Sequence, residues 1–138
     1  MISVFAEAGE FDGTKPLLCA VITVIECPSG QECINITPKQ LGISRFSVID
    51  FDKQEIHPTK ESGISRKSRI ENMEHIDGKL ILQGAEDGIE GVRDGVGYTI
   101  AISEDTGEFV LSASGEQVAF IIFGACTPLP RTEEFDSQ

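Results

Sequence analysis

The sequence has little positive charge and no long apolar run. Its 138 residues contain 11 Lys and Arg against 23 Asp and Glu, a formal net charge of −12 at pH 7. Such an acidic protein is a poor candidate for binding nucleic-acid phosphates or an anionic lipid surface. The longest strictly apolar runs, residues 17–22 and 118–123, are far shorter than the roughly 20 residues that a membrane-spanning helix needs. We therefore predict no nucleic-acid partner and no membrane insertion.

Groups for nucleophilic catalysis are scarce. Such catalysis needs a base beside the nucleophile, and the chain has two histidines, His57 before a proline and His75 before a turn. The motifs G-x-S-x-G, H-E-x-x-H and the Walker loop are missing. We predict a protein that is not an enzyme and has no cofactor. The alternative is a hydrolase that uses Asp50 and Asp52, which would share one face of a strand about 7 Å apart.

Acidic residues gather in the glycine-rich segment 86–97, where oxygen ligands could wrap a Ca²⁺ ion. The acidic residues of this segment are Glu86, Asp87, Glu90 and Asp94. The D-x-D-x-D-G spacing of a calcium loop is missing, so we predict no metal site and leave Ca²⁺ binding open.

Charge is distributed unevenly along the chain. Residues 60–69 have a net charge of +3 and residues 86–116 a net charge of −7. The two stretches could attract each other within the fold, or each could steer a partner.

Strand-forming residues dominate the composition. The chain has 17 Ile and 8 Val but only 7 Leu and 2 Met, and branched side chains favour pleated sheets. Asp77-Gly78 is a strong hairpin signal, and Thr37 followed by Pro38 predicts a short helical turn near residues 38–41. Residues 59–69 read as a loop or an exposed edge. The predicted strands are residues 16–27, 46–51 with a continuation toward 56 left open, 69–76, 79–85, 98–103, 108–113 and 118–126.

The first and last predicted strands differ from the others because both of their faces are apolar. In the first strand, alternation places Leu17, Cys19, Val21 and Ile25 on one face and Leu18, Ala20, Ile22 and Val24 on the other. Two such strands are most simply explained if they lie side by side and close the sheet. We therefore predict an all-β fold, an antiparallel meander of about seven to eight strands that closes into a small barrel or sandwich. A flat open sheet is the alternative.

The four cysteines stand at positions 19, 27, 33 and 126, with no C-x-x-C motif that would suggest a zinc knuckle. Of the three possible pairings we favour Cys19 with Cys126, on the two terminal strands, and Cys27 with Cys33, which bracket a tight loop. The alternative is four reduced thiols. Disulfides would place the protein in an oxidising compartment, so we predict a periplasmic or secreted protein.

The two ends of the chain read differently from its body. Residues 2–8 end in Ala-Glu-Ala, like the last residues of a secretory signal peptide, so residues 1–10 are predicted to be a leader remnant or a flexible N-terminus. Residues 11–127 form a single β domain. Residues 128–138 are predicted to be a disordered acidic tail.

Apolar side chains on both faces of the last strand suggest an interface. Phe120 and Ile122 face one way, and Ile121 and Phe123 face the other. A homodimer is therefore possible if closure leaves one set exposed. Tyr98 is a candidate for binding a ligand, in a cavity or groove shared with Phe109 and the acidic loop.

Several segments together resemble an uncharacterised family of small secreted or periplasmic β-proteins from proteobacteria. They are residues 11–20 with Pro-Leu-Leu-Cys at 16–19, the Asp-containing strand at 46–51, the stretch from 97 to the Thr-Gly turn at 106–107, and Phe-Gly-Ala-Cys at 123–126. The resemblance covers about residues 11–127. It implies an envelope or extracellular location and a β fold, but no activity and no site residues.

A fainter similarity is to the C-type lysozyme inhibitors of the bacterial envelope, which are small disulfide-linked β-barrels. Ser112-Ala113-Ser114-Gly115 matches their Ser-Ala-Ser-Gly loop, which makes Ser112, Ser114 and Gly115 candidate binding residues. After this loop the sequence differs from the pattern of these inhibitors, since Glu116-Gln117-Val118 stands where a basic and an aromatic residue would be expected. We therefore predict a non-enzymatic envelope protein that binds a protein or small ligand, with lysozyme inhibition as the alternative.

Overall fold

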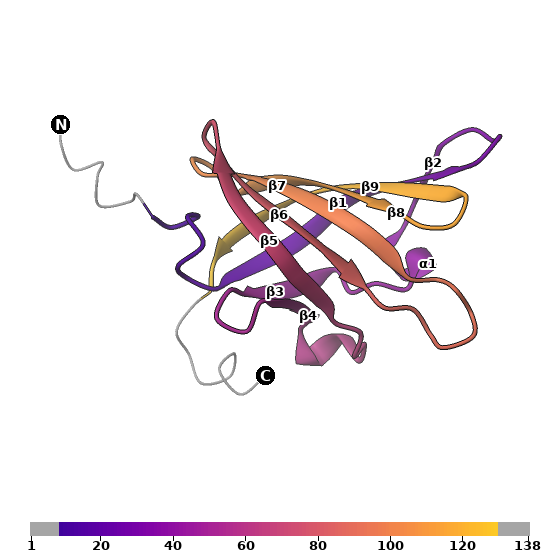
Figure 1. Ribbon diagram of the computed structural model, residues 1–138, viewed down its shortest axis with the longest axis horizontal. Helices are drawn as coiled ribbons and strands as arrows, with labels where there is room; N and C mark the ends of the chain where they lie inside the picture. Colours follow the sequence, from indigo (N-terminus) through magenta and orange to yellow (C-terminus); the bar gives the residue numbers. More distant parts are fainter. Residues whose placement is uncertain (1–8, 130–138) are drawn as a thin grey trace.

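The computed structural model describes residues 9–129, which fold into an antiparallel β-barrel (Figure 1). Eight strands form the closed barrel, in the order β1, β3, β4, β5, β6, β7, β8 and β9, and β2 is one extra strand beside β1. The predicted all-β meander and its closure are thus confirmed. The strands are β1 (Leu17–Pro28), β2 (Ile34–Ile36), β3 (Phe46–Asp50), β4 (Glu55–Pro58), β5 (Ser68–Ile76), β6 (Lys79–Glu86), β7 (Val96–Ser103), β8 (Glu108–Ser114) and β9 (Val118–Pro128).

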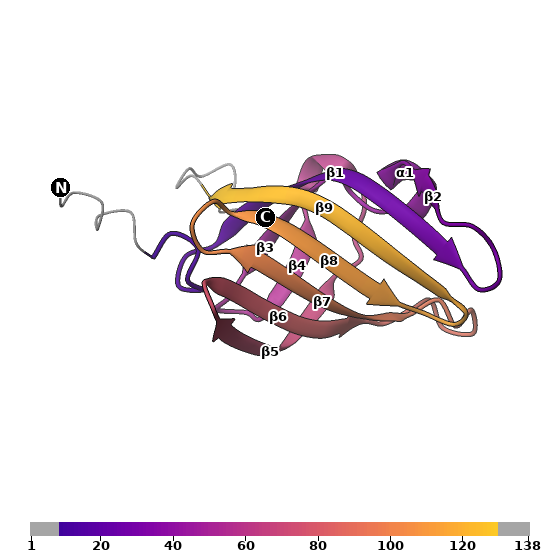
Figure 2. The same ribbon diagram turned by 90° about the horizontal axis from the view of Figure 1, so that it is seen from above.

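The barrel closes where the first long strand meets the last. β1 and β9 pair antiparallel from Leu17 opposite Pro128 to Pro28 opposite Val118, and they lie side by side in Figure 2. On its other edge, β1 pairs with β3 through its first residues and with β2 through residues 24–26. Both edges of β1 are therefore paired, and so are both edges of β9, which pairs with β1 and β8. Closure thus removes the open edges that the first and last long strands would otherwise have.

A β-bulge in β1 overturns part of the predicted alternation. The pairing with β9 shifts between Val21 and Thr23, so Ile22 is an extra residue with no direct partner and is 68% exposed. Beyond the bulge the faces exchange, and Val24 points into the core at 1% exposure. The prediction that β1 is covered on both sides throughout is therefore wrong at Ile22, because a bulge adds one residue to a strand and resets its alternation.

The predicted turns have the expected local geometry. Asp77 and Gly78 both have positive φ, 50° and 78°, which suits a two-residue turn between β5 and β6. The helical turn α1 (Pro38–Leu41) begins at Thr37, whose side chain and that of Gln40 form a reciprocal capping box.

Two connections differ from the sequence prediction. The strand expected from residue 46 ends at Asp50, and a turn at residues 51–54 separates β3 from β4. Strand β2 was not predicted, because it has three residues and pairs only with β1. The basic stretch 59–69 contains the 3₁₀ turn η2 (Lys60–Ser62), then irregular chain, then the first residues of β5.

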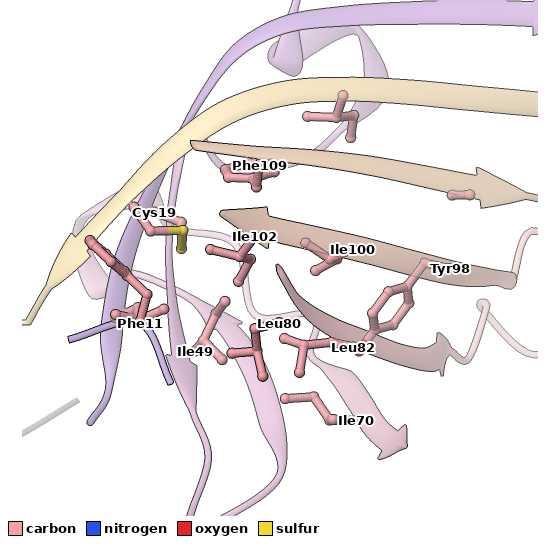
Figure 3. Packing of buried hydrophobic residues seen from close by; sticks show 14 of the residues in the cluster. Phe11, Cys19, Ile49, Ile70, Leu80, Leu82, Tyr98, Ile100, Ile102 and Phe109 are labelled. Atoms are coloured by element: carbon pink, nitrogen blue, oxygen red, sulfur yellow. A yellow bond between two sulfur atoms is a disulfide. The ribbon is translucent and has the colours of Figure 1, made fainter. Parts of the chain in front are cut away.

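One end of the barrel is filled with side chains and closed by the segment before β1. Leu17, Leu80, Leu82 and Ile102 are completely buried. Phe11 is 7% exposed and its ring lies against Gly107, in the turn between β7 and β8. Figure 3 shows Phe11 and Tyr98 at opposite ends of the core. Residues 9–15 therefore close the end of the barrel at which Phe11 lies.

The predicted chain ends fall mostly outside the described residues. The leader remnant assigned to residues 1–10 and the tail assigned to 128–138 overlap the description only at 9–10 and 128–129. There, Pro128 ends β9 and the Leu129 N–H donates to the Pro16 carbonyl at 2.9 Å. Within residues 9–129, no helix is long and apolar enough to span a bilayer.

Candidate functional site

The half of the barrel away from Phe11 encloses a cavity of about 470 Å³. Strand alternation points alternate side chains of β7, β8 and β9 toward the barrel interior, and most of these line the cavity. An eight-stranded barrel is either filled by its own side chains or holds one small ligand, and here small residues leave the space open. The lining includes the small residues Ser47, Ala113 and Gly115 and the apolar residues Val21, Leu41, Ile43, Ile49, Ile56, Ile64, Val96, Tyr98, Ile100, Phe109, Leu111, Val118, Phe120 and Ile122.

The cavity reaches solvent at a rim of charged side chains. Arg66 Nε lies 2.6 Å from Glu86 Oε2, and its Nη1 lies 3.7 Å from Asp94 Oδ2. Arg93 Nε lies 2.9 Å from Glu116 Oε1, and these two side chains are 78% and 56% exposed. The pairs join three segments: the chain before β5, the loop between β6 and β7, and the turn between β8 and β9. The basic and acidic stretches of the sequence therefore do attract each other within the fold.

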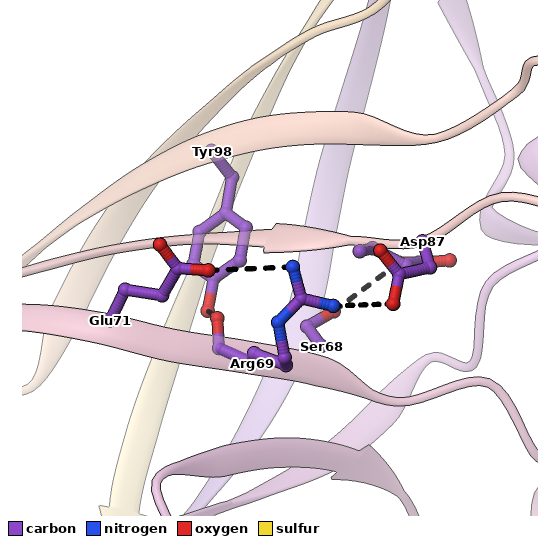
Figure 4. A network of polar contacts seen from close by, with 6 residues as sticks. Ser68, Arg69, Glu71, Asp87 and Tyr98 are labelled. Carbon is purple, nitrogen blue, oxygen red and sulfur yellow. Dashed lines mark hydrogen bonds and ion pairs between the residues drawn. The ribbon is translucent and has the colours of Figure 1, made fainter.

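Tyr98 forms part of the cavity wall and fastens β7 to β5. Its hydroxyl donates to the Arg69 carbonyl at 2.6 Å, passing over Gly84 of β6 (Figure 4). Burial raises the pKa of Tyr98 to about 12, and the nearby Glu71 carboxylate adds to the effect. The phenol is therefore a neutral donor near pH 7, held in one orientation.

Outside the barrel wall, Arg69 lies between two carboxylates. Its guanidinium donates to Asp87 and lies 3.4 Å from Glu71 Oε2 (Figure 4). The hydrogen bond that Arg69 donates to Asp87, together with the negative charge of that carboxylate, raises the pKa of Arg69 further above its ordinary value. This exposed group ties the loop after β6 to β5, and it does not line the cavity.

The structure separates the candidate binding residues. Tyr98 and Gly115 line the cavity, and so does Phe109, the predicted neighbour of Tyr98. Ser112 and Ser114 lie on the outer, exposed face of β8, which pairs with β7 on one side and β9 on the other. Of the Ser-Ala-Ser-Gly segment, only Gly115 belongs to the turn.

The residues considered for catalysis do not converge. Asp50 ends β3 and accepts the Lys53 N–H at 3.1 Å, whereas Asp52 is exposed in the following turn. The two carboxylates therefore do not share a strand face, because the strand stops between them. His57 Nδ1 lies 3.2 Å from the Pro58 carbonyl oxygen, and His75 Nδ1 lies 2.7 Å from Glu104 Oε2. None of these four side chains lines the cavity.

Three of the four carboxylates named in the acidic loop, those of Glu86, Asp87 and Asp94, are engaged with protein groups. Glu86 and Asp94 bind Arg66, and Asp87 binds Arg69. Asp94 Oδ1 also accepts the Ile89 N–H at 2.7 Å, which shapes the loop. Within residues 9–129, no three His, Cys, Asp or Glu side chains come together as metal ligands.

Sequence reasoning missed several residues of the site. Ile100 and Leu111 could have been placed by strand alternation alone. Arg66 could not, because it lies in irregular chain with no periodic signal. Leu41 and Ile43 reach the cavity from α1 and the chain after it, which the sequence does not position relative to the barrel.

All four cysteines form disulfides, in the predicted pairing. Cys19 and Cys126 face each other directly across β1 and β9 and join residues 107 positions apart. Cys27 and Cys33 close the connection between β1 and β2. The first bond lies in the cavity wall. Two disulfides indicate an oxidising environment.

The outer surface carries exposed apolar side chains around the closure. Phe123 of β9 is 41% exposed, and its partner Val110 of β8 is 42% exposed. Ile22, at the bulge beside them, is the most exposed of the large apolar residues in the described chain. Phe120 and Ile122 point into the cavity instead. The homodimer inferred from such a face stays a prediction.

Comparison with protein-family models, with curated proteins and with solved structures finds no match to this chain. The resemblances to secreted proteobacterial proteins and to C-type lysozyme inhibitors therefore receive no support from these comparisons.

Proposed function

We propose that this protein is a non-enzymatic binding module of the periplasm or the exterior, which holds a small apolar molecule inside its barrel. The observation that carries the proposal is the cavity of about 470 Å³, with apolar walls and a rim open to solvent. Binding sites for small molecules are commonly concave, mostly apolar and a few hundred Å³ in volume, with a few polar groups that set orientation.

The distribution of polar groups supports binding rather than catalysis. The Tyr98 hydroxyl is committed to the Arg69 carbonyl, and the Ser44 hydroxyl donates to the Phe46 carbonyl at 2.6 Å. The charged groups of the lining pair with one another at the rim. What the interior offers a ligand is mainly apolar surface, so removal of apolar area from water would drive binding.

A binding titration with a filled-cavity variant tests the proposal. We expect the protein to bind 1-decanol in isothermal titration calorimetry, with a negative heat-capacity change that marks burial of apolar surface. Ala113→Phe places a ring inside the cavity and should abolish binding. Ser47→Phe, from the opposite wall, is a second variant in case the first fails to fold. Val110→Phe, on the outer face, is the matched control and should bind normally.

Binding that persists in a folded Ala113→Phe or Ser47→Phe variant would place the ligand elsewhere and overturn the proposal. Fractionation of the source cells tests the location, since a purely cytosolic pool with four reduced thiols would contradict it.

Lysozyme inhibition and hydrolysis through Asp50 and Asp52 stay predictions. Titration against lysozyme activity tests the first, and Asp50→Asn the second.

A further inference from the structure

We propose that the apolar molecule carries a positively charged head group, which rests among the carboxylates at the rim of the cavity. This inference rests on the proposed function, because it assigns a ligand class to the same cavity. The apolar walls would take the hydrocarbon part, and the rim would select the charge of the head group.

The charges of the rim favour a cation over an anion. Three carboxylates and two guanidinium groups line the cavity, so the lining itself has a net charge of −1. Both guanidinium groups are already paired, Arg66 with Glu86 and Asp94, and Arg93 with Glu116. An anionic head group would have to separate one of these pairs and would then face the released carboxylate. Like charges brought together in this way oppose binding.

Glu86 is the most sheltered of the three carboxylates and is fixed in place. Its side chain is 19% exposed, against 36% for Asp94 and 56% for Glu116. It ends β6, where it pairs with Val96 of β7, and its Oε1 accepts the Ser68 hydroxyl at 3.3 Å. A charge in this position is less screened by solvent than the others, so it contributes most to selection.

Arg66, in contrast, comes from irregular chain between η2 and β5. Its guanidinium occupies the place beside Glu86 and Asp94 that the ligand's cation would take. A ligand ammonium group can therefore exchange with Arg66, whose long side chain turns toward solvent while Glu86 stays in position. Exchange of one cation for another keeps both carboxylates paired, which an anion cannot do.

The net charge of the surroundings has the same negative sign as that of the lining. Glu90 lies on the loop between β6 and β7, and the whole chain has a net charge of −12. The neighbouring cations are paired with other acids, Arg69 with Asp87 and Glu71, and Lys67 with Glu55. The field at the entrance therefore attracts cations and repels anions.

Three probes with the same ten-carbon chain test the inference: decyltrimethylammonium, 1-decanol and decanoate. Each is titrated below its micelle concentration into the intact, disulfide-bonded protein at low salt. We expect decyltrimethylammonium to bind about tenfold more tightly than decanoate, with decanol between them. Glu86→Gln and, independently, Asp94→Asn should reduce that ratio toward one.

Asp87→Asn is the matched control. It removes the same charge from the same loop, but Asp87 is 80% exposed and does not line the cavity. It should leave the ratio nearly unchanged, which separates the rim from the charge of the whole protein. Equal affinity for all three probes, tighter binding of decanoate, or an equal effect of Asp87→Asn would overturn the head-group inference while leaving apolar binding intact. Failure of decanol and both charged probes to bind would overturn the proposed function itself.

Discussion

The Tyr98 hydroxyl donates a hydrogen bond to the backbone carbonyl of Arg69, two strands away, with 2.6 Å between the oxygens. The contact is possible because Gly84 lies between them on β6. A Cβ at position 84 would lie 1.8 Å from the Arg69 carbonyl oxygen and 2.8 Å from the Tyr98 hydroxyl. Because Gly84 has no side chain, the Tyr98 ring can lie over β6 and form part of the cavity wall.

The ionisation of Tyr98 should make the protein sensitive to alkali. Its pKa is raised to about 12 in the folded chain by burial, whereas an unfolded tyrosine titrates near 10. The folded state therefore holds the phenol proton more tightly, so this stabilisation is complete below about pH 10 and is lost as pH rises toward 12. Tyr98 is the single tyrosine, so ultraviolet absorbance of tyrosinate reports it directly.

In that titration, urea-unfolded protein is the reference and should titrate near 10. Tyr98→Phe should flatten the loss of stability between pH 10 and 12. A native midpoint near 10, with the fold intact, would contradict the buried, hydrogen-bonded phenol.

Gly124→Ala should destabilise the protein by about 3 kcal/mol, at the high end of overpacking costs. The added Cβ would lie 2.1 Å from the Ala20 carbonyl oxygen and 2.5 Å from the Phe109 ring, and the backbone oxygen is held in the β1–β9 pairing. Urea denaturation followed by circular dichroism measures the change.

Gly97→Ala is the control for that substitution. It makes the same change on β7, two strands away from β9, where the nearest atom to the added Cβ is 3.9 Å away. It should leave stability within about 0.5 kcal/mol of the parent. Similar losses of stability in both variants would mean that the close approach of Phe109 and β1 to Gly124 does not cause the loss in Gly124→Ala.

The two disulfides should contribute unequally to stability. Cys19–Cys126 joins residues 107 positions apart and Cys27–Cys33 joins residues 6 apart. A disulfide stabilises a protein by constraining its unfolded chain. Removal of the first disulfide should therefore lower the free energy of unfolding by about 4 to 5 kcal/mol, and removal of the second by about 2 kcal/mol. Urea denaturation of the two variants, each with one pair of cysteines changed to alanine, measures both losses. Equal losses or the reverse order would contradict constraint of the unfolded chain as the main source of the stabilisation.

Phe11→Ala should destabilise the fold by about 3 kcal/mol, because it removes a ring buried at the end of the barrel. Phe46→Ala is the matched control, since Phe46 is 46% exposed, and it should cost about 1 kcal/mol or less. Chemical denaturation of both variants decides the point. Equal costs would show that residues 9–15 do not seal the barrel.

Local signals in the sequence were sufficient for much of the fold. Asp77-Gly78 specified a hairpin because both residues tolerate positive φ, and Thr37 with Pro38 specified a helical turn because they cap and start one. The doubly apolar first and last strands and the spacing of the cysteines were enough to predict closure and disulfide pairing. The turns depend on residues that are neighbours in the sequence. Closure could be predicted because the alternation of side chains along a strand shows which of its faces are apolar.

The cavity and its charged rim were decided by the tertiary structure. Whether a barrel is filled or hollow depends on which side chains are brought together from different strands, and the small residues Ser47 and Ala113 line the same cavity only after closure. The bulge at Ile22 and the approach of Arg66 to Glu86 likewise depend on contacts between distant segments. The sequence therefore determined an acidic, disulfide-linked antiparallel β meander and left barrel and sandwich as alternatives. The tertiary structure decided that the meander closes into a barrel, what space lies inside it and which charges surround the entrance.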